Sequence, residues 1–224
     1  MTTMTDRDVD RLWAAMDDQR DRTASMLETL TIDDWLHPSL CEGWNVRQVA
    51  AHLTLQQLTI RESLAFTLAH PEVMRGLTLN RTIQDLAVAQ ARTVEPAEII
   101  ARIRGMIGSR RHNAFVTPLE ALTDSLVHSQ DIAIPLGIDL TMDPEAAVRV
   151  ANRRWETRHG WQARVFRKVP LDTHRFTATD IDWSRGDGPE VVGPIAPLLL
   201  VLCGRMVALD RLTGDGVEQL RHRA

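Results

Sequence analysis

The sequence predicts a mainly α-helical protein, in which a four-helix bundle precedes a small C-terminal α+β region. Before residue 140, apolar residues recur every three or four positions in four segments, the pattern of helices that bury one face. Prolines and glycines separate these segments. After residue 140, short stretches alternate polar and apolar residues, as strands do. We therefore expect two domains, residues 1–139 and 140–224.

The first predicted helix is amphipathic and extends from Asp6 to about Leu30. A short helical turn is expected at Trp35, before Pro38 interrupts the chain. The residues that would form the buried stripe of the long helix share helical spacing. They are Val9, Leu12, Trp13, Met16, Met26, Leu27 and Leu30.

The second predicted helix begins after Asn45, a residue type that often caps helices. Gln48 lies three residues further on, so the two can form a capping box. The apolar stripe continues to about His70, and Pro71 then ends the helix. This stripe consists of Val46, Val49, Leu53, Ile60 and Leu64.

The third and fourth predicted helices complete the bundle. The third spans about residues 80–106, and Pro96 is a point at which it can split. The fourth begins at Pro118, which suits the first turn of a helix, and ends near Ile134, before Pro135 and Gly137. Helices joined by short connections pack as antiparallel neighbours, so a bundle is the expected arrangement.

The C-terminal region has a different pattern. Asp143 followed by Pro144 predicts the start of a helix. Residues 164–169 and 174–183 alternate and predict strands. Residues 194–212 return to a helical pattern, and a short helix follows. This region therefore reads as a small α+β domain.

Composition excludes some partners. The chain has 26 basic and 30 acidic residues without a block of like charge, which argues against a nucleic-acid partner. The longest apolar run, Ile195–Cys203, contains Pro197 and is too short to span a membrane. The N-terminal residues are polar and lack an apolar signal core. We expect a cytoplasmic protein, either a monomer or a homodimer.

The two cysteines receive no functional assignment from the sequence. They are too few for a disulfide framework and lack metal-ligand spacing. Cys203 lies in an apolar segment, where a cysteine behaves as a small hydrophobe. Cys41 lies near His52, but nothing nearby in the sequence lowers the pKa of its thiol.

Three residues indicate a metal site. Asp124 and His128 are four residues apart and share one helix face, while His52 shares the apolar face of the second helix. Two imidazoles and one carboxylate leave a tetrahedral ion one open position, as catalytic sites do. The alternative is that His52 binds a backbone carbonyl or Asp124 and only supports packing. Asp131 can orient His128, or it can be an ordinary polar residue near the helix end.

Several segments resemble one known family. Residues 43–53 (GWNVRQVAAHL) resemble a signature of the mycothiol-dependent maleylpyruvate isomerase family, within the DinB/YfiT-like metalloenzyme superfamily. Residues 126–137 (LVHSQDIAIPLG) resemble its fourth-helix motif, and the C-terminal segments 176–194, 198–205 and 208–217 are similar to its tail. The resemblance implies a DinB/YfiT-like four-helix bundle that holds a divalent metal, usually zinc.

The resemblance also implies the ligands. The family uses a histidine on the second helix and a Glu-x-x-x-His pair on the fourth, which correspond here to His52, Asp124 and His128. Asp124 departs from that pattern, because aspartate is one methylene shorter than glutamate. Closer helices, an intervening water or ligation by Glu120 would each compensate, and we expect Asp124 to be the ligand. Nickel, iron or manganese would also suit this set.

The expected activity is mycothiol-dependent. The cofactor thiol would bind the metal as a thiolate, add to an activated double bond of a small-molecule substrate, and then depart or stay, giving an isomerase or an S-transferase. Arg205 is the candidate catalytic residue that would hold a substrate carboxylate, although a surface or salt-bridge role is the alternative. A metal-dependent hydrolase and a non-catalytic ligand-binding or stress-response protein remain the competing functions.

Overall fold

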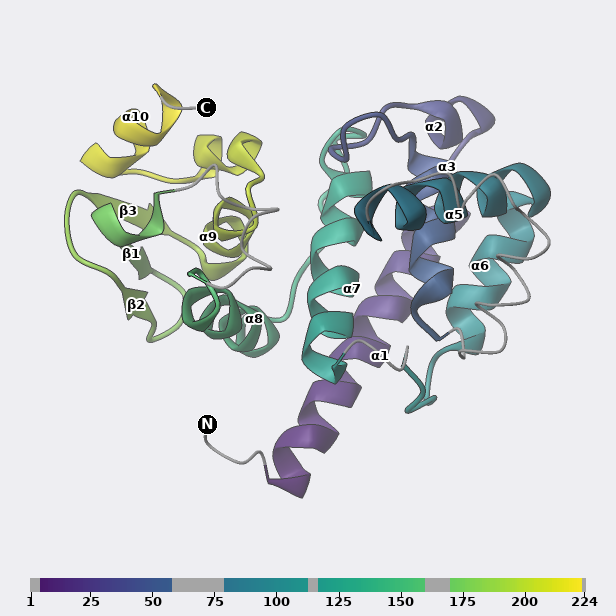
Figure 1. Cartoon of the computed structure of the whole chain (residues 1–224), viewed down its shortest axis with the longest axis horizontal. Helices are drawn as coiled ribbons and strands as arrows, with labels where there is room; N and C mark the ends of the chain where they lie inside the picture. Colours follow the sequence, from purple (N-terminus) through teal and green to yellow (C-terminus); the bar gives the residue numbers. More distant parts are fainter. Residues whose placement is uncertain (1–4, 58–78, 113–116, 160–169, 223–224) are drawn as a thin grey trace. The chain divides into compact units, whose positions relative to one another are not determined.

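A computed structural model of the chain describes residues 5–57, 79–112, 117–159 and 170–222 (Figure 1). The backbone forms two compact units, Met1–Thr141 and Met142–Ala224. The first is helical, and the second contains helices and a three-stranded sheet. This architecture confirms the predicted fold class. Within the described ranges, no helix combines the length and the apolar character that crossing a bilayer requires.

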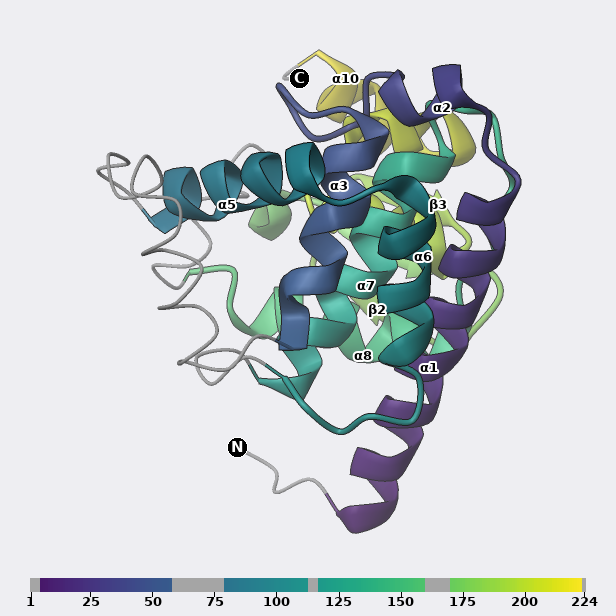
Figure 2. The same ribbon diagram turned by 90° about the vertical axis from the view of Figure 1, so that its right-hand side faces the viewer.

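The first unit contains a four-helix bundle. The described helices of this unit are α1 (Asp6–Glu28), α2 (Ile32–Leu36), α3 (Val46–Leu53), α5 (Leu79–Thr93), α6 (Pro96–Gly105) and α7 (Pro118–Ala133), with a 3₁₀ turn at Thr54–Gln57. The four helices of the bundle are α1, α3, α6 and α7. Helix α1 packs against α6 and α7, and α3 packs against the same two helices, which closes the bundle. Figure 2 shows α5 lying across the end of α3 and α6.

The bundle core is formed by the apolar faces that the helical spacing predicts. Helix α1 buries Leu12, Met16 and Leu27, and α3 buries Val46 and Val49. Two alanines of α3, at positions 50 and 51, are also completely buried. Helix α3 packs against α5, α6 and α7.

Capping boxes fix where α3 and α7 begin. The predicted box of α3 is present: Asn45 Oδ1 accepts from the Gln48 amide at 3.0 Å, and Gln48 Oε1 accepts from the Asn45 amide at 2.9 Å. Helix α7 begins in the same way, with Thr117 as N-cap and the Glu120 carboxylate accepting a hydrogen bond from the Thr117 amide. These caps fix the residues at which the two helices that carry His52 and His128 begin.

The third predicted helix splits at Pro96. Helix α5 ends at Thr93, and Glu95 has an extended backbone before α6 begins. A residue that precedes proline is disfavoured in the helical region, which explains the break. The second predicted helix ends at Leu53 and continues as the 3₁₀ turn Thr54–Gln57. Its predicted continuation from residue 58 to His70 lies outside the described residues, as does the predicted strand at 164–169.

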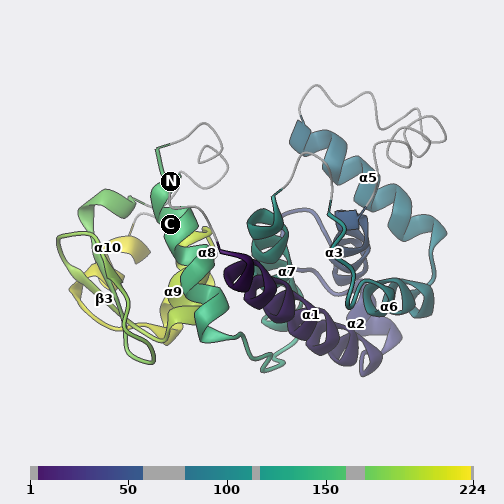
Figure 3. The same cartoon turned by 90° about the horizontal axis from the view of Figure 1, so that it is seen from below.

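The second unit combines helices with a mixed sheet. It contains α8 (Pro144–Glu156), β1 (Arg175–Ala178), β2 (Ser184–Arg185), β3 (Glu190–Gly193), α9 (Ile195–Leu202), a 3₁₀ segment (Met206–Arg211) and α10 (Asp215–Arg221), with a short 3₁₀ turn at Leu171–Thr173. Strand β1 is central, antiparallel to β2 and parallel to β3. Helix α9 packs against α8 and against β1 and β3, as Figure 3 shows.

Two features of this unit differ from the prediction. The single helix expected over residues 194–212 is wrong, because α9 ends at Leu202 and Gly204 has a φ of 82°, which the helix cannot continue through. A 3₁₀ segment follows instead. Strand β3 was not predicted, since its four residues are too few to show a period.

An exposed ion network in the first unit has a pH-dependent effect on stability. Arg104 of α6 donates to both carboxylate oxygens of Glu28, at 2.8 and 2.9 Å, and to Asp21 at 2.7 Å. The hydrogen bonds from Arg104 hold the pKa of Glu28 below its ordinary 4.5. The unfolded chain therefore binds the proton more readily than the folded chain. This contribution to stability is complete above the unfolded pKa and is lost as pH falls through the folded one.

We predict that Arg104→Met makes the melting temperature less dependent on pH in the acidic range, because the pKa of Glu28 then returns toward its ordinary value. Thermal unfolding followed by circular dichroism from neutral pH to pH values below the ordinary Glu pKa measures this. Arg102→Met is the matched control, since it removes an exposed ion pair confined to α6. Equal pH dependence in the wild type and Arg104→Met would contradict the prediction.

Candidate metal centre

The structure brings two of the three candidate ligands together. His52 of α3 and His128 of α7 have ring centroids 5.0 Å apart and ring planes at 87°. Two imidazoles bound to one tetrahedral zinc ion at ordinary Zn–N distances have centroids roughly 5 Å apart. The spacing of the two rings therefore allows both to reach the same ion. Trp44 lies edge-on to His52, with centroids 5.5 Å apart, and covers one side of it.

His52 has the properties of a neutral ligand. Burial, and to a smaller extent the charge of His128, lower its pKa to about 3. Its Nδ1 atom is buried and has no hydrogen-bond partner among the described residues. A buried ring nitrogen without a partner costs free energy unless something binds it. Bonding of this nitrogen to a backbone carbonyl or to Asp124, the packing-only alternative, is therefore not what the described residues show.

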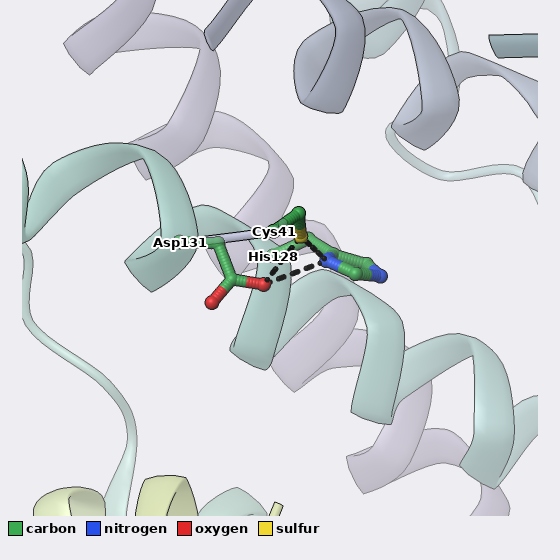
Figure 4. Close-up of side chains that lie close together, drawn as sticks. All are labelled: Cys41, His128 and Asp131. Atoms are coloured by element: carbon green, nitrogen blue, oxygen red, sulfur yellow. Dashed lines mark hydrogen bonds and ion pairs between the residues drawn. The ribbon is translucent and has the colours of Figure 1, made fainter. Parts of the chain in front are cut away.

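His128 is held from its Nδ1 side (Figure 4). This atom lies 2.9 Å from Asp131 Oδ2 and 3.5 Å from Cys41 Sγ. The thiol of Cys41 also donates to Asp131 Oδ2, at 3.1 Å. Burial lowers the pKa of His128, but the hydrogen bonds and charges of Asp131 and Cys41 outweigh burial and raise it to about 10. A hydrogen bond from Nδ1 to the Asp131 carboxylate needs the proton on Nδ1, and in the neutral ring this arrangement leaves the lone pair on Nε2.

Asp124 occupies α7 one turn before His128 and is half-buried. The charge of His128 contributes to the lowered pKa of His52, and Asp131 and Cys41 raise the pKa of His128; Asp124 is a cause of neither shift. Glu120, the alternative carboxylate, forms the capping box at the start of α7. It lies about two helical turns before His128, one turn further than Asp124, and its carboxylate bonds to the start of the helix.

Another group of ligand-type side chains is compact. In the described part of the chain, Cys41, His128 and Asp131 have ligand atoms that all lie within 4.8 Å of one another. In a zinc tetrahedron the corresponding atoms would be about 3.4–3.6 Å apart. The Cys41–Asp131 and His128–Asp131 distances, 3.1 and 2.9 Å, are shorter and are those of hydrogen bonds. The three side chains are therefore hydrogen-bonded to one another on the Nδ1 side of His128, where they are also close enough to be a second candidate for a metal site.

Sequence reasoning missed the contact of Cys41 with this centre. The contact depends on the loop between α2 and α3, where Ser39 bonds the Trp44 carbonyl through both its amide and its hydroxyl, each at 2.9 Å. Leu40 donates its amide to the Asp131 carbonyl at 3.0 Å. No helical spacing relates Cys41 to His128. The sequence signal available was only the position of Cys41 just before the second helix.

Arg205, the candidate carboxylate-binding residue, lies in the second unit. It follows Gly204 and donates Nη1 to the Cys203 carbonyl at 2.8 Å. It is half-buried and close to Arg154 of α8, which is 6% exposed. Burial lowers the pKa of Arg154, Cys203 raises it, and the charge of Arg205 lowers it further. Two neighbouring guanidinium groups repel each other, and an anion bound between them would relieve that repulsion.

Solved structures share this fold. The chain is similar to a crystal structure of the mycothiol-dependent maleylpyruvate isomerase, with 14% identity, a TM-score of 0.53 and 96% of each chain covered. A crystal structure of a point mutant of that enzyme matches at 13% identity, with the same TM-score and coverage. No curated protein sequence gives a significant match.

A family model matches most of the helical first unit. The model of the mycothiol maleylpyruvate isomerase N-terminal domain matches residues 16–129. This range contains His52, Asp124 and His128, together with Cys41. It covers about half of the 224 residues, and the bundle that it spans is the part that brings the two histidines together. The chain belongs to the mycothiol maleylpyruvate isomerase family.

Proposed function

We propose that this protein is a mycothiol-dependent metalloenzyme of the maleylpyruvate isomerase type. In this proposal His52, His128 and Asp124 hold a divalent metal, zinc in the first instance. The observation that carries the proposal is the pair of facing imidazoles, 5.0 Å apart, of which one has a buried nitrogen without a partner in the described chain. Such a pair suits a metal better than it suits a packed core.

The donor set fits a metal that activates a thiol. Bound there, the metal supplies Lewis acidity that favours the thiolate form of mycothiol at neutral pH. In this proposal the chain would contribute two imidazoles, each neutral once it binds the metal, and one carboxylate, so the donor set would carry a single negative charge. His128 keeps its proton on Nδ1, against Asp131, and presents Nε2. Trp44 packs edge-on against His52.

Asp124 is the proposed third ligand. It is one helical turn from His128, so their side chains share a face of α7. Glu120 is engaged with Thr117 at the helix start. An aspartate ligand is chemically equivalent to the glutamate of the family pattern, and its shorter side chain needs α3 and α7 to be closely packed, as the buried alanines of α3 permit.

Arg205 is proposed to bind a carboxylate of the substrate, with Arg154 beside it. Guanidinium groups bind carboxylates through paired hydrogen bonds. The substrate class that suits this proposal is a small molecule with an activated double bond, to which a thiol can add, and a carboxylate, which an arginine can bind. If the thiol then departs, the reaction is an isomerisation, and if it stays, the reaction is an S-transfer.

We predict that the purified protein binds one divalent metal per chain and that His52→Ala and His128→Ala each weaken metal binding by more than about 100-fold, since each removes a ligand. Competition with a chromophoric chelator measures the affinity. Asp124→Asn should weaken binding, whereas Glu120→Gln should not, because glutamine preserves the capping box while removing the carboxylate. Metal loss in Glu120→Gln with retention in Asp124→Asn would reverse the assignment.

We predict that turnover of maleylpyruvate requires mycothiol and that Arg205→Met lowers kcat/KM by roughly 10- to 100-fold, the loss expected for a hydrogen bond to a charged group. Metal content should not change in this variant. Arg211→Met, at an exposed position of the same unit, is the control. Turnover of substrates without any thiol would contradict the proposal and favour a hydrolase.

A further inference from the structure

We propose that Asp131 and Cys41 are positioning residues of the metal centre, which hold His128 in the tautomer and orientation that present its Nε2 atom to the metal. The inference rests on the proposed function, because it concerns how one proposed ligand is held. Neither residue touches the metal in this arrangement. Both act through the ring of His128.

Asp131 supplies the anchor. Its side chain is completely buried on α7, and its Oδ2 atom receives two donors: His128 Nδ1 at 2.9 Å and Cys41 Sγ at 3.1 Å. A buried carboxylate is stable only when donors satisfy it, so this oxygen requires a proton on Nδ1. A neutral imidazole has one N–H, and fixing it on Nδ1 leaves Nε2 as the lone-pair donor.

Cys41 limits where Oδ2 can lie. Its thiol approaches the same oxygen from the loop between α2 and α3, and its Sγ lies 3.5 Å from His128 Nδ1 (Figure 4). The three atoms thus form a closed triangle, in which movement of the carboxylate away from His128 would break the thiol contact. A thiol donates weakly, so its contribution should be smaller than that of the carboxylate.

The same residue also fixes the second histidine. The main-chain carbonyl of Asp131 accepts from the Leu40 amide at 3.0 Å, and the loop then closes on itself through Ser39 and Trp44. This loop leads directly into Asn45, the cap of α3. Asp131 therefore orients His128 with its side chain and fastens the start of the helix of His52 with its backbone.

Two roles for Cys41, supporting His128 or binding the metal itself, require different positions of the metal relative to His128. If Cys41 and Asp131 bound zinc with His128 Nδ1, their atoms would need to move apart from 3.1 Å to about 3.6 Å. The metal would then lie on the Nδ1 side of His128, with a protein sulfur among its ligands. In the positioning arrangement it lies on the Nε2 side, and a sulfur ligand comes only from an added thiol.

Cobalt substitution tests this. Cobalt-loaded wild-type protein should show no sulfur-to-cobalt absorption until mycothiol is added, and Cys41→Ala should not change the spectrum.

Competition titrations with zinc should show that Asp131→Ala weakens metal affinity by about 10- to 100-fold, the range typical for a residue that holds a ligand. Asp131→Asn, which keeps an acceptor oxygen, should lose less, and Cys41→Ser, which keeps a donor, should lose less than Cys41→Ala.

Ser129→Ala is the matched control. Ser129 is buried on α7 beside His128 and accepts a hydrogen bond from Gln19 at 3.0 Å, so its loss lowers stability without touching Asp131. Thermal unfolding identifies variants that have lost the fold. In folded, zinc-loaded protein, nitrogen-15 spectra of the imidazoles should show the Nδ1 proton of His128 in the wild type and its weakening in Asp131→Ala.

Three results would overturn the inference. Unchanged zinc affinity in folded Asp131→Ala, with a wild type that binds zinc, refutes the positioning role and leaves the proposed function standing. A sulfur-to-cobalt band in the wild type without added thiol, lost in Cys41→Ser, makes Cys41 a ligand. A wild type that binds no metal at all removes the proposed function and this inference together.

Discussion

Two imidazole rings in contact inside a helical bundle cannot both carry a charge, and the first unit resolves this by giving them opposite environments. His52 is desolvated, and its pKa falls to about 3. His128 faces a buried carboxylate and a thiol, and its pKa rises to about 10. His52 is thus uncharged at neutral pH, whereas His128 is hydrogen-bonded to the Asp131 carboxylate. The packing of α3 on α7, the two capping boxes and the loop before α3 all maintain this asymmetric pair.

The part of this arrangement that depends on local chemistry could be predicted from the sequence. Asn45 and Gln48 identify the start of α3, Pro118 identifies that of α7, and helical spacing places His52 and His128 on inward faces. Local rules succeed here because a cap and a period are properties of neighbouring residues. The break at Pro96 could be anticipated for the same reason.

What could not be predicted depends on the path of a loop or on a rotamer. Cys41 reaches His128 because the chain folds back between Ser39 and Trp44, and no spacing rule describes that path. Helical spacing places Asp124 on the face of His128 but leaves the direction of its carboxylate undetermined. In the second unit, the end of α9 at Gly204 depends on a positive φ that sequence composition does not reveal.

The closed loop before α3 has a consequence for the energetics of cofactor loading. In many small zinc proteins the metal pays the entropy of ordering its own ligands, so folding and binding are one event. Here the packing of α1, α3, α6 and α7, together with the hydrogen bonds that Asp131 accepts from His128 and from the Leu40 amide, orders the histidines without a metal. If the proposed centre binds a metal, ligands ordered in this way would separate metal binding from folding, and exchange of one ion for another would leave the bundle intact.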